Sequence, residues 1–149
     1  MQKRVTLILA AAVVLVVVFI WGNSALSQSI SAIISDAVGN FMAGIIGQGD
    51  GSTTVGGFSV RKLAHLLEYC ALGALLPLFF ASFLKPKSLR LALTVSLGFS
   101  VPLIDETIQI FSNRGPSLTD VWIDVAGFAV GCAMVYLAFF IKKKIELKK

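Results

Sequence analysis

The stretch VTLILAAAVVLVVVFIW, residues Val5–Trp21, contains no charged side chain. At about 1.5 Å of rise per residue, its roughly 17 residues are just long enough as a helix to cross a hydrocarbon core of about 30 Å. A cleaved signal peptide is the alternative, but the run is longer than the usual apolar core of about 7–15 residues, and no clear cleavage pattern follows it. The stretch therefore predicts a membrane-spanning helix.

Three more apolar runs of about 20 residues each predict spans at 63–84, 89–111 and 121–141. The chain is 56% hydrophobic and only 14% charged, and its mean hydropathy is +0.86. These values exclude a soluble globular or disordered protein. We expect an all-α polytopic membrane protein with four transmembrane helices, forming a single domain over residues 1–149.

The segment between the first two spans, residues 22–60, contains no Lys or Arg. Apolar residues recur in its first half at helical spacing, and a Gly-rich stretch follows at 47–57. The recurring residues are Leu26, Ile30, Ile33, Ala37, Phe41 and Ile45. This pattern predicts an extracellular amphipathic helix on the membrane surface, followed by a loop.

Basic residues set the expected orientation. The formal net charge is +5, but ten of the 13 Lys and Arg residues flank one side of the predicted membrane. They are Lys3, Arg4, Lys85, Lys87, Arg90, Lys142, Lys143, Lys144, Lys148 and Lys149. Under the positive-inside rule both termini are then cytoplasmic, and the basic clusters determine topology rather than form a nucleic-acid site.

Ionisable side chains occur inside the predicted spans, where each costs on the order of 2.5–3.5 kcal/mol near a helix centre. In or just before the second span they are Arg61, His65 and Glu68. The third span contains Asp105, Glu106 and the amide Gln109. Asp120 and Asp124 lie at the start of the fourth, and Arg114 lies in the last loop. Within each span they recur at helical spacing, and the topology puts every set in the outer half of the bilayer. Gly127 and Gly131 continue the face of Asp124 and predict close helix packing.

Combined, these residues resemble the motifs of the VanZ-like family of small bacterial membrane proteins. The motifs are His65-x-x-Glu68-Tyr69, Asp105-Glu106-x-x-Gln109, Arg114, Ser117 and Asp120, then Gly127 and Gly131. Asp124 departs from the pattern, because Asn is usual there. The resemblance implies a multi-pass protein of the bacterial cytoplasmic membrane that contributes to teicoplanin-type glycopeptide resistance, without specifying a reaction.

All nine polar residues, Arg114 included, are expected to line one ligand-binding site. Carboxylate oxygens with an imidazole can also hold a divalent metal, for which Glu68, Asp105, Asp120 and His65 are the candidates. The alternative is a polar network that only holds the helices in register. The number of acids at one depth favours a site.

Three functions fit such a site. The first is binding of a lipid, a lipid-linked envelope molecule or a lipoglycopeptide antibiotic at the outer face. The second is an enzyme that acts with or without a bound metal. Its candidate catalytic residues are His65, Glu68, Asp105 and Glu106. The third is a small transporter, against which residues 70–84 and 125–141 contain no Asp, Glu, Lys, Arg or His. The sequence predicts no oligomeric state.

Overall fold

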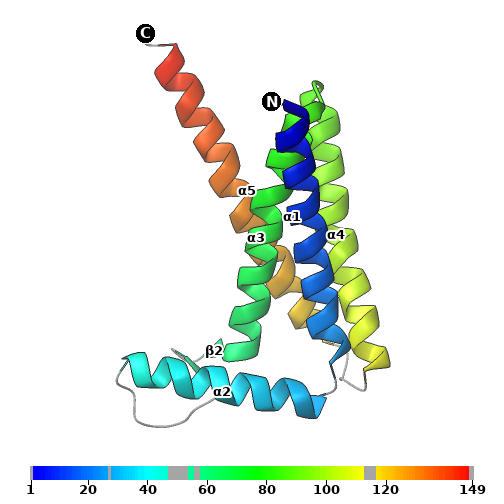
Figure 1. Cartoon of the computed structure of the whole chain (residues 1–149), viewed down its shortest axis with the longest axis vertical. Helices are drawn as coiled ribbons and strands as arrows, with labels where there is room; N and C mark the ends of the chain where they lie inside the picture. Colours follow the sequence, from blue (N-terminus) through cyan, green and yellow to red (C-terminus); the bar gives the residue numbers. More distant parts are fainter. Residues whose placement is uncertain (1, 27, 47–53, 56–57, 113–116, 148–149) are drawn as a thin grey trace.

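The computed structural model of the chain describes residues 2–26, 28–46, 54–55, 58–112 and 117–147. Its helices are α1 (Gln2–Ala25), α2 (Gln28–Ile46), α3 (Val60–Phe83), α4 (Lys87–Phe111) and α5 (Leu118–Glu146). Helices α1, α3, α4 and α5 form a bundle, and α2 lies across one end of it (Figure 1). Both termini lie at the other end, so we call the two ends the α2 end and the terminal end.

The four bundle helices contain 24, 24, 25 and 29 residues, and each is long and apolar enough to cross a membrane. They coincide with the four predicted spans to within a few residues at each end. Large apolar side chains such as Leu15, Phe99 and Leu137 point out of the bundle, as contact with lipid requires. The predicted all-α membrane fold with four spans is confirmed.

Helix α2 has the crosswise placement expected of an interfacial helix (Figure 1). Its side chains Ile30, Ile33, Val38 and Phe41 are exposed, although they are apolar. In the predicted loop at 47–57, the structure describes only the two-residue strand β1 (Thr54–Val55), which pairs antiparallel with β2 (Phe58–Ser59). The rest of that loop lies outside the described residues.

Helices α3 and α5 cross with their backbones in contact. A Cβ atom added at Gly127 would collide with the carbonyl oxygen of Leu66, and one added at Gly131 would collide with the carbonyl oxygen of Cys70. Glycine at both positions removes the side chains that would keep the helices apart. The close packing predicted from the Gly-x-x-x-Gly spacing is therefore present, and it fixes which parts of α3 and α5 face each other.

We expect Gly131→Ala to destabilise the bundle by about 1–3 kcal/mol, since the added methyl group meets backbone that cannot move aside. The measurement is thermal unfolding of the purified protein in mild detergent. Gly22→Ala in α1 is the matched control, because nothing lies within 4 Å of a Cβ atom there. Equal loss of stability in both variants would contradict the close crossing.

Candidate functional site

Polar side chains from all four bundle helices meet near the α2 end. Buried among them are Ser24 on α1, Asp105 and Gln109 on α4, and Asp124 on α5. Asp105 and Gln109 are one helical turn apart, so both turn to the same interior face of α4. The structure therefore collects, in one layer, polar residues that are far apart in the sequence.

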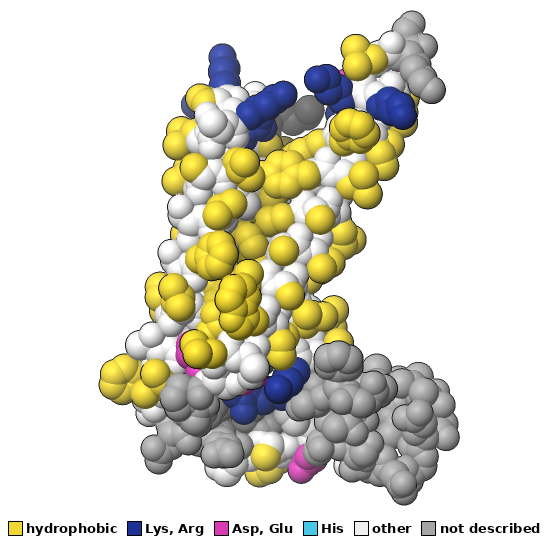
Figure 2. All heavy atoms as spheres, turned by 180° about the vertical axis from the view of Figure 1, so that it is seen from behind, with side chains coloured by type: hydrophobic (Ala, Val, Ile, Leu, Met, Phe, Trp, Pro, Cys, Tyr) yellow, Lys and Arg dark blue, Asp and Glu magenta, His cyan; other side chains and the backbone are white. Residues whose placement is uncertain are grey.

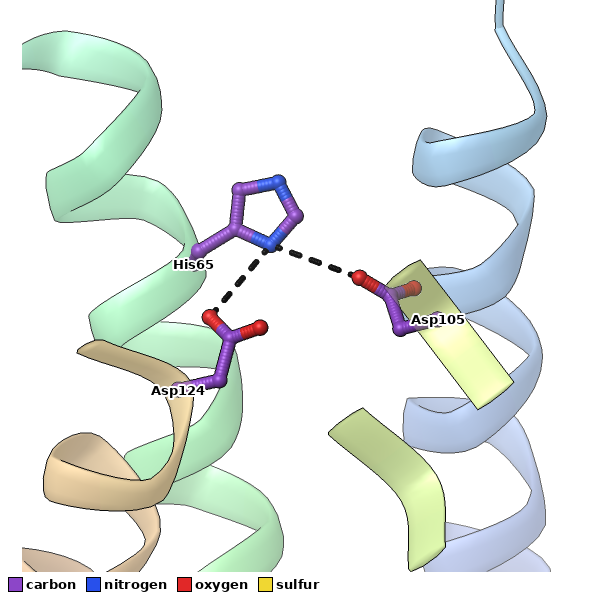
Figure 3. A group of neighbouring side chains, drawn as sticks. All are labelled: His65, Asp105 and Asp124. Carbon is purple, nitrogen blue, oxygen red and sulfur yellow. Dashed lines mark ion pairs between the residues drawn. The ribbon is translucent and has the colours of Figure 1, made fainter. Parts of the chain in front are cut away.

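The centre of this layer is a cluster of His65, Asp105 and Asp124, which we call the central triad (Figure 3). The two carboxylates, from α4 and α5, point toward the imidazole on α3. His65 Nδ1 lies 3.9 Å from Asp105 Oδ2 and 3.8 Å from Asp124 Oδ1, and the exposed fractions of the three side chains are 13%, 0% and 3%. These distances allow ion pairing but exceed the usual hydrogen-bond length.

The carboxylate of Asp105 is held by one side chain, which a second side chain holds in turn. Gln109 Nε2 donates a hydrogen bond of 2.9 Å to Asp105 Oδ2, the same oxygen that faces His65. Arg61 in turn donates a hydrogen bond of 2.9 Å to Gln109 Oε1. The amide of Gln109 is oriented from both sides, so it fixes the direction of the carboxylate and connects it to the positive charge of Arg61.

Glu68 is held by a residue that belongs to none of the sequence motifs. Asn23, at the end of α1, donates a hydrogen bond of 2.8 Å to Glu68 Oε1. The other carboxylate oxygen, Oε2, is buried and accepts no hydrogen bond from the described residues. Asn23 carries no charge that would mark it in an apolar run, and only its position at the end of the first span, near the other polar residues, could have indicated this role.

The remaining predicted site residues make contacts outside the central triad. Asp120 Oδ1 lies 3.7 Å from Lys62 Nζ, and Glu106 Oε1 accepts a hydrogen bond of 2.5 Å from the backbone N–H of Ser117. Glu106 thus links α4 to the residue that precedes α5. Arg114 lies outside the described residues. The polar layer therefore has a buried centre and a rim of more exposed ion pairs.

Two small cavities adjoin the central triad. The first, of about 110 Å³, is lined by α2 residues including Ile34 and Val38 and by Arg61, His65 and Glu68 of α3. The second, of about 120 Å³, is lined by α3 and α5, including Asp120 and Asp124. Arg61 and His65 line both cavities. Since a water molecule occupies about 30 Å³ of liquid, each cavity can hold a few waters or a small polar group.

The charges of this layer are unbalanced. Among the described residues, Asp105 and Asp124 belong to the central triad, and Glu68 lines a cavity beside it. The permanent positive charges nearby are those of Arg61 and of Lys62, which pairs with Asp120 at the rim. Carboxylates removed from water require compensation by a proton, a cationic side chain or a bound cation. The layer is therefore suited to accept a cation.

The central triad fits the donor requirements of a divalent transition metal. One imidazole nitrogen and two carboxylate oxygens lie within 4.8 Å of one another. Such a mixed set suits Zn²⁺, Mn²⁺ or Fe²⁺, and three protein ligands leave coordination positions open for a substrate. Of the four metal ligands predicted from the sequence, His65 and Asp105 belong to the triad. Glu68 and Asp120 lie outside the triad, and its third member is Asp124.

The comparisons with known proteins identify a family for the chain. Residues 6–140 match the model of the VanZ/LLP1 family. The matched region contains every motif on which the sequence resemblance rests. It includes all or most of each of the four bundle helices. No curated protein and no solved structure matches the chain.

Proposed function

The chain belongs to the VanZ/LLP1 family of membrane proteins, as its motifs predicted, and we propose that it binds the polar headgroup of an amphiphilic envelope molecule. The site is the polar layer at the α2 end. The molecule is a lipid-linked, phosphate-bearing component of the bacterial envelope or a lipoglycopeptide, and its binding contributes to teicoplanin-type resistance.

The observation that carries this proposal is the composition of the first cavity. One wall is the apolar side of α2, with Ile34 and Val38, and the other contains Arg61, His65 and Glu68. An amphiphile needs this combination, because its chain requires apolar contact while its headgroup requires charge and hydrogen bonds. The guanidinium of Arg61 carries five N–H donors suited to an anionic group, and one of them bonds Gln109 among the described residues.

The proposed binding can be measured by native mass spectrometry of the full chain in mild detergent. The probes are a polyprenyl phosphate and the corresponding polyprenol, which lacks the phosphate. We expect the phosphate to bind about tenfold more tightly, since a hydrogen bond to a charged group contributes about 1.5–3 kcal/mol.

Arg61→Gln should remove this difference while leaving polyprenol binding unchanged. Glutamine keeps a polar group beside Gln109 but carries no charge. Lys142→Gln is the matched control, because it removes one positive charge at the terminal end, where Lys142 is exposed and pairs with Glu146. Equal binding of both probes to the unmodified chain would contradict the proposal.

The proposed site faces the outside of the bacterial cytoplasmic membrane. The positive-inside rule assigns ten basic residues to the cytoplasm. Those of the ten that the structure describes, such as Arg4, Lys87 and Lys143, lie at the terminal end. Because both termini lie at that end, the α2 end is then extracellular.

This orientation predicts a labelling pattern in intact cells. In a background with Cys70 and Cys132 replaced by Ala, Asn40→Cys on the exposed side of α2 should react with a membrane-impermeant maleimide. Lys144→Cys, exposed near the other end, should react only after the cells are opened. The reverse pattern would overturn the orientation and move the proposed site to the cytoplasmic leaflet.

The central triad favours a second candidate function, a metal-dependent enzyme acting on the same class of molecule. When bound there, a divalent metal would polarise a phosphoryl or carbonyl oxygen or lower the pKa of a water. Within the chain, His65, Asp105 and Asp124 would hold the ion, and Gln109 would orient Asp105. Arg61, which lines both cavities, would bind a substrate phosphate.

A further inference from the structure

A second, unrelated site is indicated at the terminal end, where α5 separates from the rest of the bundle. After the crossing at Gly131, α5 leans away from α3 and α4 (Figure 1). Figure 2 shows apolar side chains lining the opening between α5 and the rest of the bundle, with Lys and Arg side chains on both sides of its mouth. We call this opening between α4 and α5 the groove.

The groove consists of two adjoining cavities between α4 and α5. The one nearer the middle of the two helices, of about 410 Å³, is almost entirely apolar and is lined by residues such as Gly98, Phe128 and Cys132. The other, of about 480 Å³, is lined by Lys87, Arg90 and Lys143 together with aromatic side chains. Leu91 and Tyr136 line both cavities, so the two adjoin. An apolar channel thus leads to a cluster of three cations.

These cations have no anionic partner among the described residues. No acidic side chain lines either cavity, and the ion pair at this end joins Lys142 to Glu146 instead. Lys87 and Arg90 belong to the first turn of α4, so they lie beside the positive end of that helix, and this turn contains no acidic residue. An anion in the mouth of the groove would relieve this repulsion.

We propose that this groove binds an anionic glycerophospholipid, with the phosphate between Arg90, Lys87 and Lys143 and an acyl chain along the apolar channel between α4 and α5. Basic pockets between transmembrane helices on the cytoplasmic side are suited to such headgroups. The positive-inside rule alone requires basic residues near the helix ends, but it does not require them to converge on an open apolar channel.

The test is native mass spectrometry of the full chain, titrated with phosphatidylglycerol or with zwitterionic phosphatidylcholine. We expect a clear preference for phosphatidylglycerol. The double variant Arg90→Gln/Lys143→Gln should bind it about 30-fold more weakly, from about fivefold per basic residue. Binding of phosphatidylcholine, whose phosphate charge is already balanced by its own choline, should weaken much less, and thermal unfolding should show that the variant remains folded.

The matched control is Lys142→Gln/Lys144→Gln, which removes the same charge from exposed residues of α5 that do not line the groove. It should retain phosphatidylglycerol binding, as should Arg61→Gln at the α2 end. Equal weakening by the control would show that the lipid responds only to the net charge of this end, and the proposal would fail. No preference between the two lipids would also overturn it.

A second variant tests the apolar part of the groove independently of charge. Ala133 lines the apolar cavity of about 410 Å³ and is exposed, so Ala133→Phe should occupy part of the channel without disturbing buried packing. We expect weaker phosphatidylglycerol binding with all three cations in place. Unchanged binding would contradict insertion of the acyl chain. Dimers that exclude lipid from the groove would show that a second copy of the chain occupies it instead.

Discussion

Asp105→Asn is expected to lower the affinity of the purified chain for Zn²⁺ or Mn²⁺ by more than about 100-fold, since even changes outside the ligand set cost about 10–100-fold. Asp105 is fully buried, and its Oδ2 faces His65 Nδ1 at 3.9 Å. Asparagine has the same shape but supplies a neutral oxygen, so the loss would report the charge of the ligand and not its packing. The measurement is calorimetric titration with each metal, together with elemental analysis of the purified protein.

Two further variants show whether the effect belongs to the central triad. Gln109→Leu removes the hydrogen bond that orients Asp105 and should weaken metal binding by about 10–100-fold. Asp120→Asn is the matched control, because its carboxylate contacts Lys62 at the rim. If Asp120→Asn lost the metal as completely as Asp105→Asn, the ion would respond to the total acidic charge, and the triad would not be its site.

The four spans are predictable from sequence because a long uncharged apolar run has few other stable environments. The depth of the polar layer is also predictable, since the rise per residue and the alternating direction of the spans place His65 and Asp105 near the same end. The first expectation depends on hydropathy and the second on distances along the helix axes. Both quantities follow directly from the order of residues in the chain.

Which residues face each other across the layer is harder to predict. Asp120 and Asp124 share one face of α5, and the sequence favoured Asp120 as a metal ligand. In the structure α5 touches α3 at Gly127, so Asp124, which is nearer this crossing, lies beside His65. Asp120 is one turn farther out, where it reaches Lys62. The position of the crossing decides the set of neighbours, and the glycine spacing alone does not give its register.

Local hydrogen bonds account for the other differences. Glu106 follows Asp105 directly but is turned about 100° around the helix, and it accepts a hydrogen bond from the N–H of Ser117. Asn23 joins α1 to Glu68 through its uncharged amide. Hydropathy does not distinguish this residue from other uncharged polar residues at the ends of spans. The groove at the terminal end was not predicted at all, because it depends on the direction in which α5 leaves the crossing.

Resistance should depend on Arg61 more than on any other described cation. When the chain is expressed in a susceptible Gram-positive host, we expect the minimum inhibitory concentration of teicoplanin to rise, and Arg61→Gln to return it to the level of the host alone. Arg61 is the described cation that lines both cavities, so its loss removes from each of them a charge that attracts an anionic headgroup. Membrane levels of each variant must be matched by immunoblot.

The control for this experiment lies on the same helix. Leu67 is next to Glu68 in the sequence but points out of the bundle, so Leu67→Ala should keep full resistance. Asp105→Asn then separates the two candidate functions, because it removes the proposed metal while leaving Arg61 in place. Retained resistance would favour headgroup binding without a metal, and lost resistance would favour the metal-dependent enzyme. If Arg61→Gln and Asp105→Asn both kept full resistance at normal protein levels, the polar layer would serve only to hold the helices together.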